Sequence, residues 1–324
     1  MKTNTTTTTT TNNTTPTNTK LILFHHSIPT KQNPGGLFLL AFLSLSALAF
    51  LLTLYSSLSH PTHTIPTTHS PIPTTTQTSS LPRETSDALL YYYSFSNQTN
   101  RMSDPDARAV ARAITSCSPC SVLVFGLGHE TPLWRALNPR GRTVFIDESD
   151  YFVSRYEGRH ANLEAYEVQY ATTVSEFKEL VHTAKAQAGS ECRPVQNLLF
   201  SDCRLGINDM PNQLYEVDWD VILVDGPRGY YPSAPGRMSA IFTAGVLARS
   251  KRGGSERTHV FVHDFEREVE RVCGEEFLCK ENLVESTRTL AHYVVERVGD
   301  RSGSSEFCPG KTVGHQVQQQ RRRR

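Results

Sequence analysis

Two short polar segments that follow apolar runs contain the residue types best suited to acid–base chemistry. Asp225 follows the run Asp220–Val224 (DVILV), and His263 with Asp264 follows Thr258–Val262 (THVFV). If the two runs are neighbouring parallel strands, about 4.8 Å apart, both carboxylates come within reach of one divalent cation or one substrate hydroxyl. Asp225 or His263 is then the candidate base for that hydroxyl, and Asp225 and Asp264 are candidate metal ligands.

The same residues also have a purely structural interpretation, which the sequence leaves open. Asp225 can cap the turn that follows it, and His263 and Asp264 can cap a helix that begins near Phe265. Taken one at a time, each residue is explained as well by its turn as by catalysis.

A pair of glycines and a spaced acid mark a candidate cofactor site. The apolar run Ser121–Gly128 ends in Gly126 and Gly128, where the backbone can turn tightly and approach a ligand. About twenty residues further on, the run Arg142–Ile146 is followed by two acids, of which we assign Glu148 to the ribose hydroxyls of a cofactor. The third glycine of the dinucleotide motif is absent, which favours S-adenosylmethionine over NAD or FAD.

These residues need a scaffold that places strand ends side by side. The four apolar runs are rich in β-branched residues and bounded by turn residues, and helix-length segments separate several of them. Such runs are typical of strands covered on both faces. The sequence therefore predicts an α/β fold with a doubly wound, mostly parallel sheet of the S-adenosylmethionine methyltransferase-like type, in which ligands bind beyond the carboxyl ends of the strands.

An uncharged apolar stretch near the N-terminus predicts a membrane anchor. Leu37–Leu54 contains no charge, Pro or Gly, and as a helix it is about 27 Å long, close to the hydrocarbon thickness of a bilayer. The apolar region of a cleaved signal peptide is shorter. Because Lys2, Lys20 and Lys31 all precede the stretch, we expect a type II topology with the N-terminus in the cytosol.

The chain then divides into five predicted parts. They are a disordered cytosolic tail (1–36), a transmembrane signal anchor (37–58), a Ser/Thr/Pro-rich luminal stem (59–85), a luminal methyltransferase-like domain (86–308) and a disordered basic tail (309–324). Asn97 is a candidate glycosylation site in the luminal domain.

All seven cysteines lie in the predicted luminal domain, where an oxidising compartment lets them pair. Close spacing suggests Cys192 with Cys203 and Cys273 with Cys279, although spacing does not fix connectivity, and an odd number leaves one thiol over. The CxxC at 117–120 has the spacing of a redox motif or half a zinc site, but no second half completes it.

Charge and motif spacing exclude or disfavour two other classes of protein. With 33 Lys and Arg against 32 Asp and Glu, the net charge of +1 gives no overall electrostatic field that would attract nucleic acid. The run Arg321–Arg324 is typical of a solvated tail. The segment Asp218–Asp220 has the DxD spacing of glycosyltransferases, but it precedes a strand instead of following one.

Long sequence blocks resemble a plant family. VFGLGHETPLWRALNPRGRTVFIDE, VDWDVILVDGPRGYYPSAPGRMSAIFTAGVLAR and HVFVHDFEREVE are similar to the polysaccharide-biosynthesis domain shared by irregular xylem 15-like proteins and glucuronoxylan 4-O-methyltransferases. The resemblance covers about 86–308, and the segment NTKLILFHHSIP at 18–29 is similar to the irregular xylem 15 branch. The extension after Cys308 departs from the pattern.

The resemblance implies a Golgi type II membrane protein needed to make xylan in plant secondary walls. In the methyltransferase branch it implies methyl transfer from S-adenosylmethionine to O4 of glucuronic acid side chains. By motif, Gly126, Gly128 and Glu148 carry over as cofactor-binding candidates, and Asp225, His263 and Asp264 as catalytic candidates.

Two functions remain open from the sequence. The domain is either a xylan O-methyltransferase, with glucuronoxylan as substrate, or a non-catalytic partner that binds other xylan-synthesising proteins at the Golgi membrane. The first predicts cofactor binding and turnover, and the second predicts binding of partner proteins without turnover.

Overall fold

The structure is a computed structural model that describes residues 45–52, 80–298 and 306–308. The chain separates into two units, Met1–Pro73 and Thr74–Arg324, and in the first only residues 45–52, which are helical, are described. Among the described residues, no helix has the length and apolar character needed to cross a membrane. Most of the predicted anchor (37–58), and the tails predicted at 1–36 and 309–324, lie outside these residues.

The second unit is built on one seven-stranded sheet. In the order β3-β2-β1-β4-β5-β7-β6, the first five strands run parallel and the last two pair antiparallel. The strands are β1 (Ser121–Phe125), β2 (Arg142–Asp147), β3 (Glu164–Glu167), β4 (Val221–Val224), β5 (Arg257–His263), β6 (Leu283–Ser286) and β7 (Leu290–Glu296). The predicted mostly parallel sheet is confirmed, because the four apolar runs form its centre.

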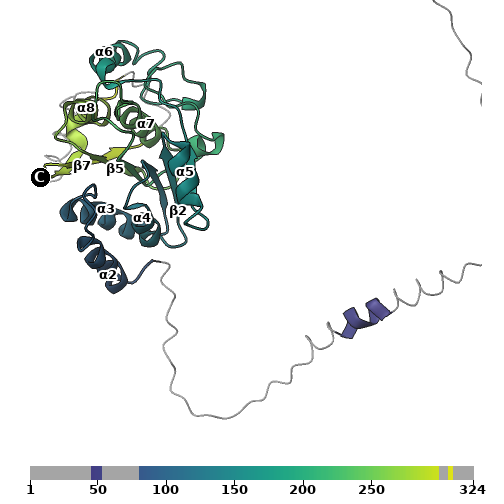
Figure 1. The fold of residues 1–324 in the computed structure, drawn as a ribbon. Helices are drawn as coiled ribbons and strands as arrows, with labels where there is room; N and C mark the ends of the chain where they lie inside the picture. The colour runs from purple at the N-terminus through teal and green to yellow at the C-terminus, as the bar shows by residue number, and fades with distance from the viewer. Residues whose placement is uncertain (1–44, 53–79, 299–305, 309–324) are drawn as a thin grey trace, which may run out of the picture. The chain divides into compact units, whose positions relative to one another are not determined.

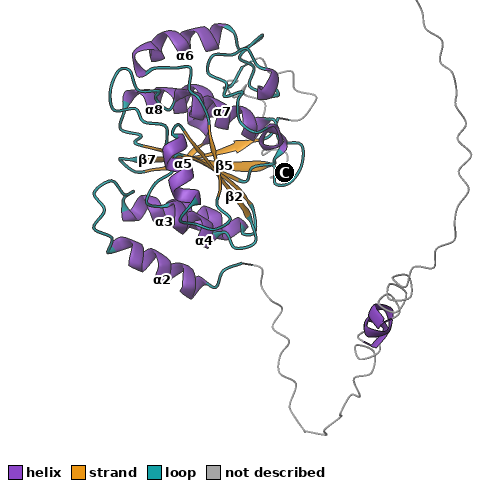
Figure 2. Ribbon diagram, turned by 45° about the vertical axis from the view of Figure 1, so that its right-hand side comes forward, coloured by secondary structure: helices purple, strands orange, loops and turns teal. Residues whose placement is uncertain are grey.

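Helices cover both faces of this sheet (Figures 1 and 2). The helices are α2 (Arg83–Ser94), α3 (Asp104–Cys117), α4 (Thr131–Leu137), α5 (Asp150–Glu157), α6 (Phe177–Ala186), α7 (Met238–Arg249) and α8 (Glu268–Cys273). Helix α2 begins before residue 86, so the folded unit crosses the boundary predicted between stem and domain.

Alternation along the central strands creates two separate cores. In β1, Leu123 and Phe125 belong to the core beneath α6, α7 and α8, whereas Val122 and Val124 belong to the core beneath α2, α3 and α4. All residues of α7 are buried, and the helix contacts β4, β5, β7 and α8. The sheet is therefore doubly wound, as predicted.

The cysteines pair only partly as the spacing suggested. Disulfides join Cys192 to Cys203, as predicted, and the CxxC at 117–120 is also a disulfide. The predicted pairing of Cys273 with Cys279 is wrong: Cys279 is bonded to Cys308, and Cys273 is a free, buried thiol. Cys273 is the last residue of α8 and its side chain is buried in the core.

Candidate active site

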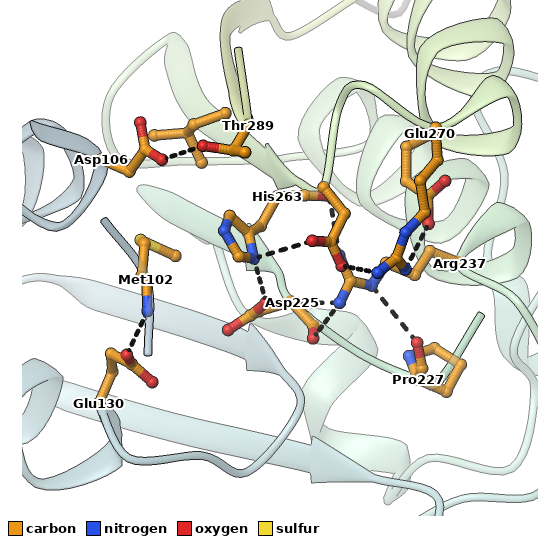
Figure 3. Close-up of polar contacts among 12 residues, drawn as sticks. Met102, Asp106, Glu130, Asp225, Pro227, Arg237, His263, Glu270 and Thr289 are labelled. Carbon is orange, nitrogen blue, oxygen red and sulfur yellow. Dashed lines mark hydrogen bonds and ion pairs between the residues drawn. The ribbon is translucent and has the colours of Figure 1, made fainter. Parts of the chain in front are cut away.

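The carboxyl ends of β4 and β5 bring His263 and Asp225 into direct contact (Figure 3). The strands are parallel neighbours in which Val224 pairs with Val262, so the residues that follow lie side by side. The Nδ1 atom of His263 is 2.7 Å from the Oδ1 atom of Asp225. The predicted adjacency of these two strand ends is confirmed.

Burial and charge act in opposite directions on this pair. Burial lowers the pKa of His263, but the hydrogen bond to Asp225 and the charges of Asp225 and Asp264 outweigh it and raise the pKa above its ordinary value. Burial raises the pKa of Asp225, but the hydrogen bond from His263 and the charge of Arg237 hold that pKa below its ordinary value. Asp225 is therefore a carboxylate that can support a protonated His263.

The second ring nitrogen of His263 is available to a ligand. The side chain is 16% exposed, and among the described residues only Nδ1 has a hydrogen-bond partner. With Asp225 accepting from a protonated Nδ1, the free Nε2 of a neutral ring is an acceptor for a hydroxyl proton.

Arg237 is a structural centre of the site that the sequence did not single out as such. It precedes α7, its side chain is 3% exposed, and it donates to three backbone carbonyls at the ends of β4 and β5. Its Nη2 lies 2.7 Å from the carbonyl oxygen of Asp225, and its Nη1 lies 2.7 Å from that of His263. Arg237 is thus a positioning residue.

Asp264 faces the arginines instead of joining a metal site. Its backbone is left-handed, with φ of 58°. Its Oδ2 atom lies 2.9 Å from Nη1 of Arg237 and 2.9 Å from Nη2 of Arg267. Within the described ranges, no group of three or more His, Cys, Asp or Glu side chains is arranged to hold a metal ion. The metal site predicted at Asp225 and Asp264 is therefore not supported. The alternative in which His263 and Asp264 cap a helix is also wrong, because α8 begins only at Glu268.

The glycine turn after β1 packs directly against the end of β4. Gly126 has φ of 109°, a conformation that favours glycine, and a Cβ there would lie 2.9 Å from the backbone nitrogen of Gly226. A Cβ on Gly226 would lie 2.7 Å from the Cα of Gly126. Both positions therefore require glycine for this backbone contact.

The two acids after β2 have different contacts. Asp147 accepts a hydrogen bond from the backbone nitrogen of Leu127 at 2.8 Å, so it holds the glycine turn, and burial raises its pKa. Glu148 accepts from the backbone nitrogen of Arg228 at 3.1 Å and forms an ion pair with its guanidinium. Glu148, predicted to bind ribose hydroxyls, is therefore occupied here by the loop that follows β4.

Two further polar groups at this edge were missed from the sequence. The hydroxyl of Tyr170 is buried without a hydrogen-bond partner in the described part of the chain, and burial with the charges of Asp147 and Glu148 raises its pKa. Glu130 is buried and accepts hydrogen bonds at 2.7 Å from the Tyr93 hydroxyl and from the backbone nitrogen of Met102. Glu130 thereby ties the segment around α2 to the glycine turn. Glu130 lies in the glycine motif and could have been singled out there, whereas a lone tyrosine such as Tyr170 carries no signal.

The aromatic residues near these strand ends separate into two groups. Trp134 is 1% exposed and belongs to the core. Tyr230 and Tyr231, in the loop after β4, are 68% and 47% exposed, and the guanidinium of Arg267 lies 4.5 Å from the centre of the Tyr230 ring.

The DxD segment lies at the opposite, amino edge of the sheet. Asp218 accepts hydrogen bonds from the backbone of Arg252, and Asp220 accepts one from the backbone of Ser121 and pairs with Lys251. These contacts fix the start of β4, so the segment has a structural role there.

The fold and this edge define a doubly wound α/β domain with a His–Asp pair where such sheets bind ligands. The chain belongs to the IRX15/IRX15L/GXM family, whose model matches residues 105–293.

Three relatives from Arabidopsis thaliana show where in this family the chain lies. It is 52% identical to Protein IRX15-LIKE, with 91% of this chain and 95% of that protein covered. It is 50% identical to Protein IRREGULAR XYLEM 15 over the same shares. Glucuronoxylan 4-O-methyltransferase 3 is 41% identical over 73% of this chain and 77% of its own length.

Proposed function

We propose that this protein is an S-adenosylmethionine-dependent O-methyltransferase of xylan, acting on O4 of glucuronic acid side chains. The hydrogen-bonded pair of His263 and Asp225, at the ligand-binding edge and beside a backbone turn that only glycine fits, carries the proposal. The relative that is 41% identical is a glucuronoxylan 4-O-methyltransferase, and it suggests the reaction and the substrate class.

The residues at this edge fit the proposed cofactor. Gly126 and Gly226 let the turns after β1 and β4 pack backbone against backbone, which places the ends of these two strands next to each other. Tyr170 offers a buried hydroxyl without a partner among the described residues, near the acids that follow β2. Glu148 becomes available to ribose hydroxyls once Arg228 releases it. The cofactor supplies an electrophilic methyl group on a sulfonium.

The chain's own residues then supply binding, orientation and proton removal. Neutral His263 accepts the hydroxyl proton at Nε2, and Asp225 stabilises the imidazolium that results through Nδ1. Arg237 fixes the backbone on which both stand, so the hydroxyl oxygen meets a base of defined orientation.

We extend the proposal to location. The apolar stretch at 37–58 and the lysines before it support a Golgi type II membrane protein with the described domain in the lumen. The disulfides agree with an oxidising compartment. Asn97 lies in an exposed segment after α2, where it is accessible to glycosylation.

Calorimetric titration of the full chain with S-adenosylmethionine tests the proposal. We expect micromolar binding that Gly126→Val abolishes, because its Cβ would meet the backbone of Gly226. The exposed Gly189→Val is the matched control and should bind as the unsubstituted protein does. No binding by the folded, unsubstituted protein would overturn the enzyme proposal and favour the non-catalytic partner of xylan-synthesising proteins.

A further inference from the structure

A second candidate binding site lies at the amino edge of the sheet. A cavity of about 540 Å³ is lined by the loop before β2 and by the first residues of β2 and β3. His263 and Asp225 lie beyond the carboxyl ends of the parallel strands. The two sites are thus at least a strand length apart, about 17 Å for a strand of five or six residues.

The loop that forms one wall is held rigidly. The side chain of Asn138 accepts a hydrogen bond from the backbone nitrogen of Cys120 at 3.1 Å and donates to its carbonyl oxygen at 2.9 Å. Asn138 also donates to the Thr143 hydroxyl at 3.0 Å. A Cβ on Gly141 would lie 2.2 Å from the Asn138 side chain, so the turn is shaped around this amide. The cavity wall is therefore preorganised.

Unusual backbone conformations gather at this cavity. Four non-glycine residues in the described ranges have positive φ, and two of them, Arg140 at 63° and Asn162 at 60°, line the cavity. Arg135 donates to the carbonyl oxygens of Ala161 and Asn162 at 3.2 Å, which holds that wall in place. Such conformations persist where the surroundings enforce them, and they concentrate at functional sites.

The cavity carries an excess of positive charge. Its charged lining is Arg135, Arg140, Arg142 and Glu164. Arg142 and Glu164 form a two-point ion pair, with distances of 2.6 and 3.1 Å, and neutralise each other. The positive charges of Arg135 and Arg140 remain: Arg135 already donates to two backbone carbonyls, whereas no side-chain partner of Arg140 is found in the part of the chain that the structure describes. An oxyanion is the complementary ligand.

We propose that this cavity binds the carboxylate of a uronic acid residue on the polysaccharide, away from the reacting sugar. The choice of uronate rests on the proposed function, which makes an acidic glycan the substrate. Guanidinium groups bind carboxylates through two parallel hydrogen bonds, and the fixed loop sets the backbone position from which the exposed Arg140 side chain reaches the ligand. A polymer held at two sites binds more tightly than at either alone, because the second contact is intramolecular.

Binding measurements on the full chain without cofactor test the cavity. Glucuronoxylan oligosaccharides, neutral xylo-oligosaccharides of equal length and inorganic phosphate are titrated separately. We expect the acidic oligosaccharide to bind at least tenfold more tightly than the neutral one. Arg140→Gln should lower the affinity for the acidic oligosaccharide about tenfold. Arg193→Gln, which removes an exposed arginine elsewhere, is the matched control and should change nothing.

A second variant separates loss of the ligand contact from loss of the fold. Arg140→Gly removes the guanidinium but relieves the left-handed backbone, so it should weaken binding equally without lowering the melting temperature. Unchanged affinity in both variants, or an equal loss in Arg193→Gln, would overturn the site. Inorganic phosphate that binds as tightly as the acidic oligosaccharide, with the same dependence on Arg140, would show an inorganic anion site and overturn the uronate assignment.

The outcome is distinguishable from failure of the proposed function. Methyl transfer to a short acceptor with a single glucuronic acid should be the same in Arg140→Gln and in the unsubstituted protein, because this acceptor reaches only the carboxyl edge. Arg140-dependent binding without any methyl transfer would overturn the proposed function alone.

Discussion

Replacing Asp225 by Asn should lower the pKa of His263, because the substitution keeps the shape of the side chain but removes its charge. In the unsubstituted protein, burial lowers the pKa of His263, and the hydrogen bond and charge of Asp225 raise it by more. Without the carboxylate, burial and the nearby Arg237 dominate, and the smaller contribution of Asp264, 3.9 Å away, remains.

The size of this shift follows from the 2.7 Å contact. A hydrogen bond to a charged group contributes about 1.5–3 kcal/mol, and one pKa unit corresponds to about 1.4 kcal/mol. We therefore expect Asp225→Asn to lower the pKa of His263 by about one to two units. The acid limb of the pH–rate profile should move to lower pH by the same amount, while the maximal rate falls because the ring loses its orientation.

NMR titration of the His263 ring in the full chain is the assay. Asp202→Asn, an exposed carboxylate away from the site, is the control and should leave the pKa unchanged. An unchanged or higher pKa in Asp225→Asn would refute the assignment of this contact as the source of the shift.

The same pair predicts how stability depends on pH. His263 has a raised folded-state pKa, so its contribution is present below about pH 6.5 and is lost as pH rises through the folded pKa. Asp225 has a lowered folded-state pKa, so its contribution is present above about pH 4 and is lost as pH falls through the folded pKa. The pair should stabilise most between these values, and Asp225→Asn should flatten the profile there.

Three further substitutions test other contacts. Gly226→Ala should lower the free energy of unfolding by about 1–3 kcal/mol, because its Cβ would lie 2.7 Å from the Cα of Gly126. Denaturant titration measures this, and an unchanged midpoint would contradict the contact. Cys308→Ser should lower the free energy of unfolding by about 2–4 kcal/mol, because it removes the disulfide to Cys279. Peptide mapping of the unsubstituted protein that finds another partner for Cys308 would contradict the pairing. Arg228→Ala should tighten S-adenosylmethionine binding in calorimetry by up to about fivefold, because it frees the Glu148 oxygen that is paired with the guanidinium. Weaker binding would make Arg228 a ligand contact instead.

The sequence predicted the four central strands but missed β7 and the two edge strands, β3 and β6. Buried strands such as β4, with the sequence VILV, are apolar runs that periodicity detects directly. The edge strand β3 reads EAYE and β6 reads LVES, and polar strands of four residues have no such signal. Their pairing comes from neighbours distant in sequence, which a single chain does not reveal.

The site was predictable to the extent that it follows strand ends. Parallel strands end at one edge, so Asp225 and His263 could be placed together before the structure. The role of Arg237 could not be predicted, because it depends on a loop that folds back over both strand ends. The pairing of Cys273 with Cys279 was predicted wrongly for a similar reason. Spacing along the chain does not show which thiols the fold brings into contact.

Transfer of a labelled methyl group from S-adenosylmethionine to glucuronoxylan oligosaccharides is the most direct test of the account. The unsubstituted full chain should label O4 of glucuronic acid, and His263→Gln should bind the cofactor normally but transfer at least a hundredfold more slowly. Transfer at an undiminished rate by His263→Gln, or no transfer by the unsubstituted protein with cofactor bound, would contradict the account.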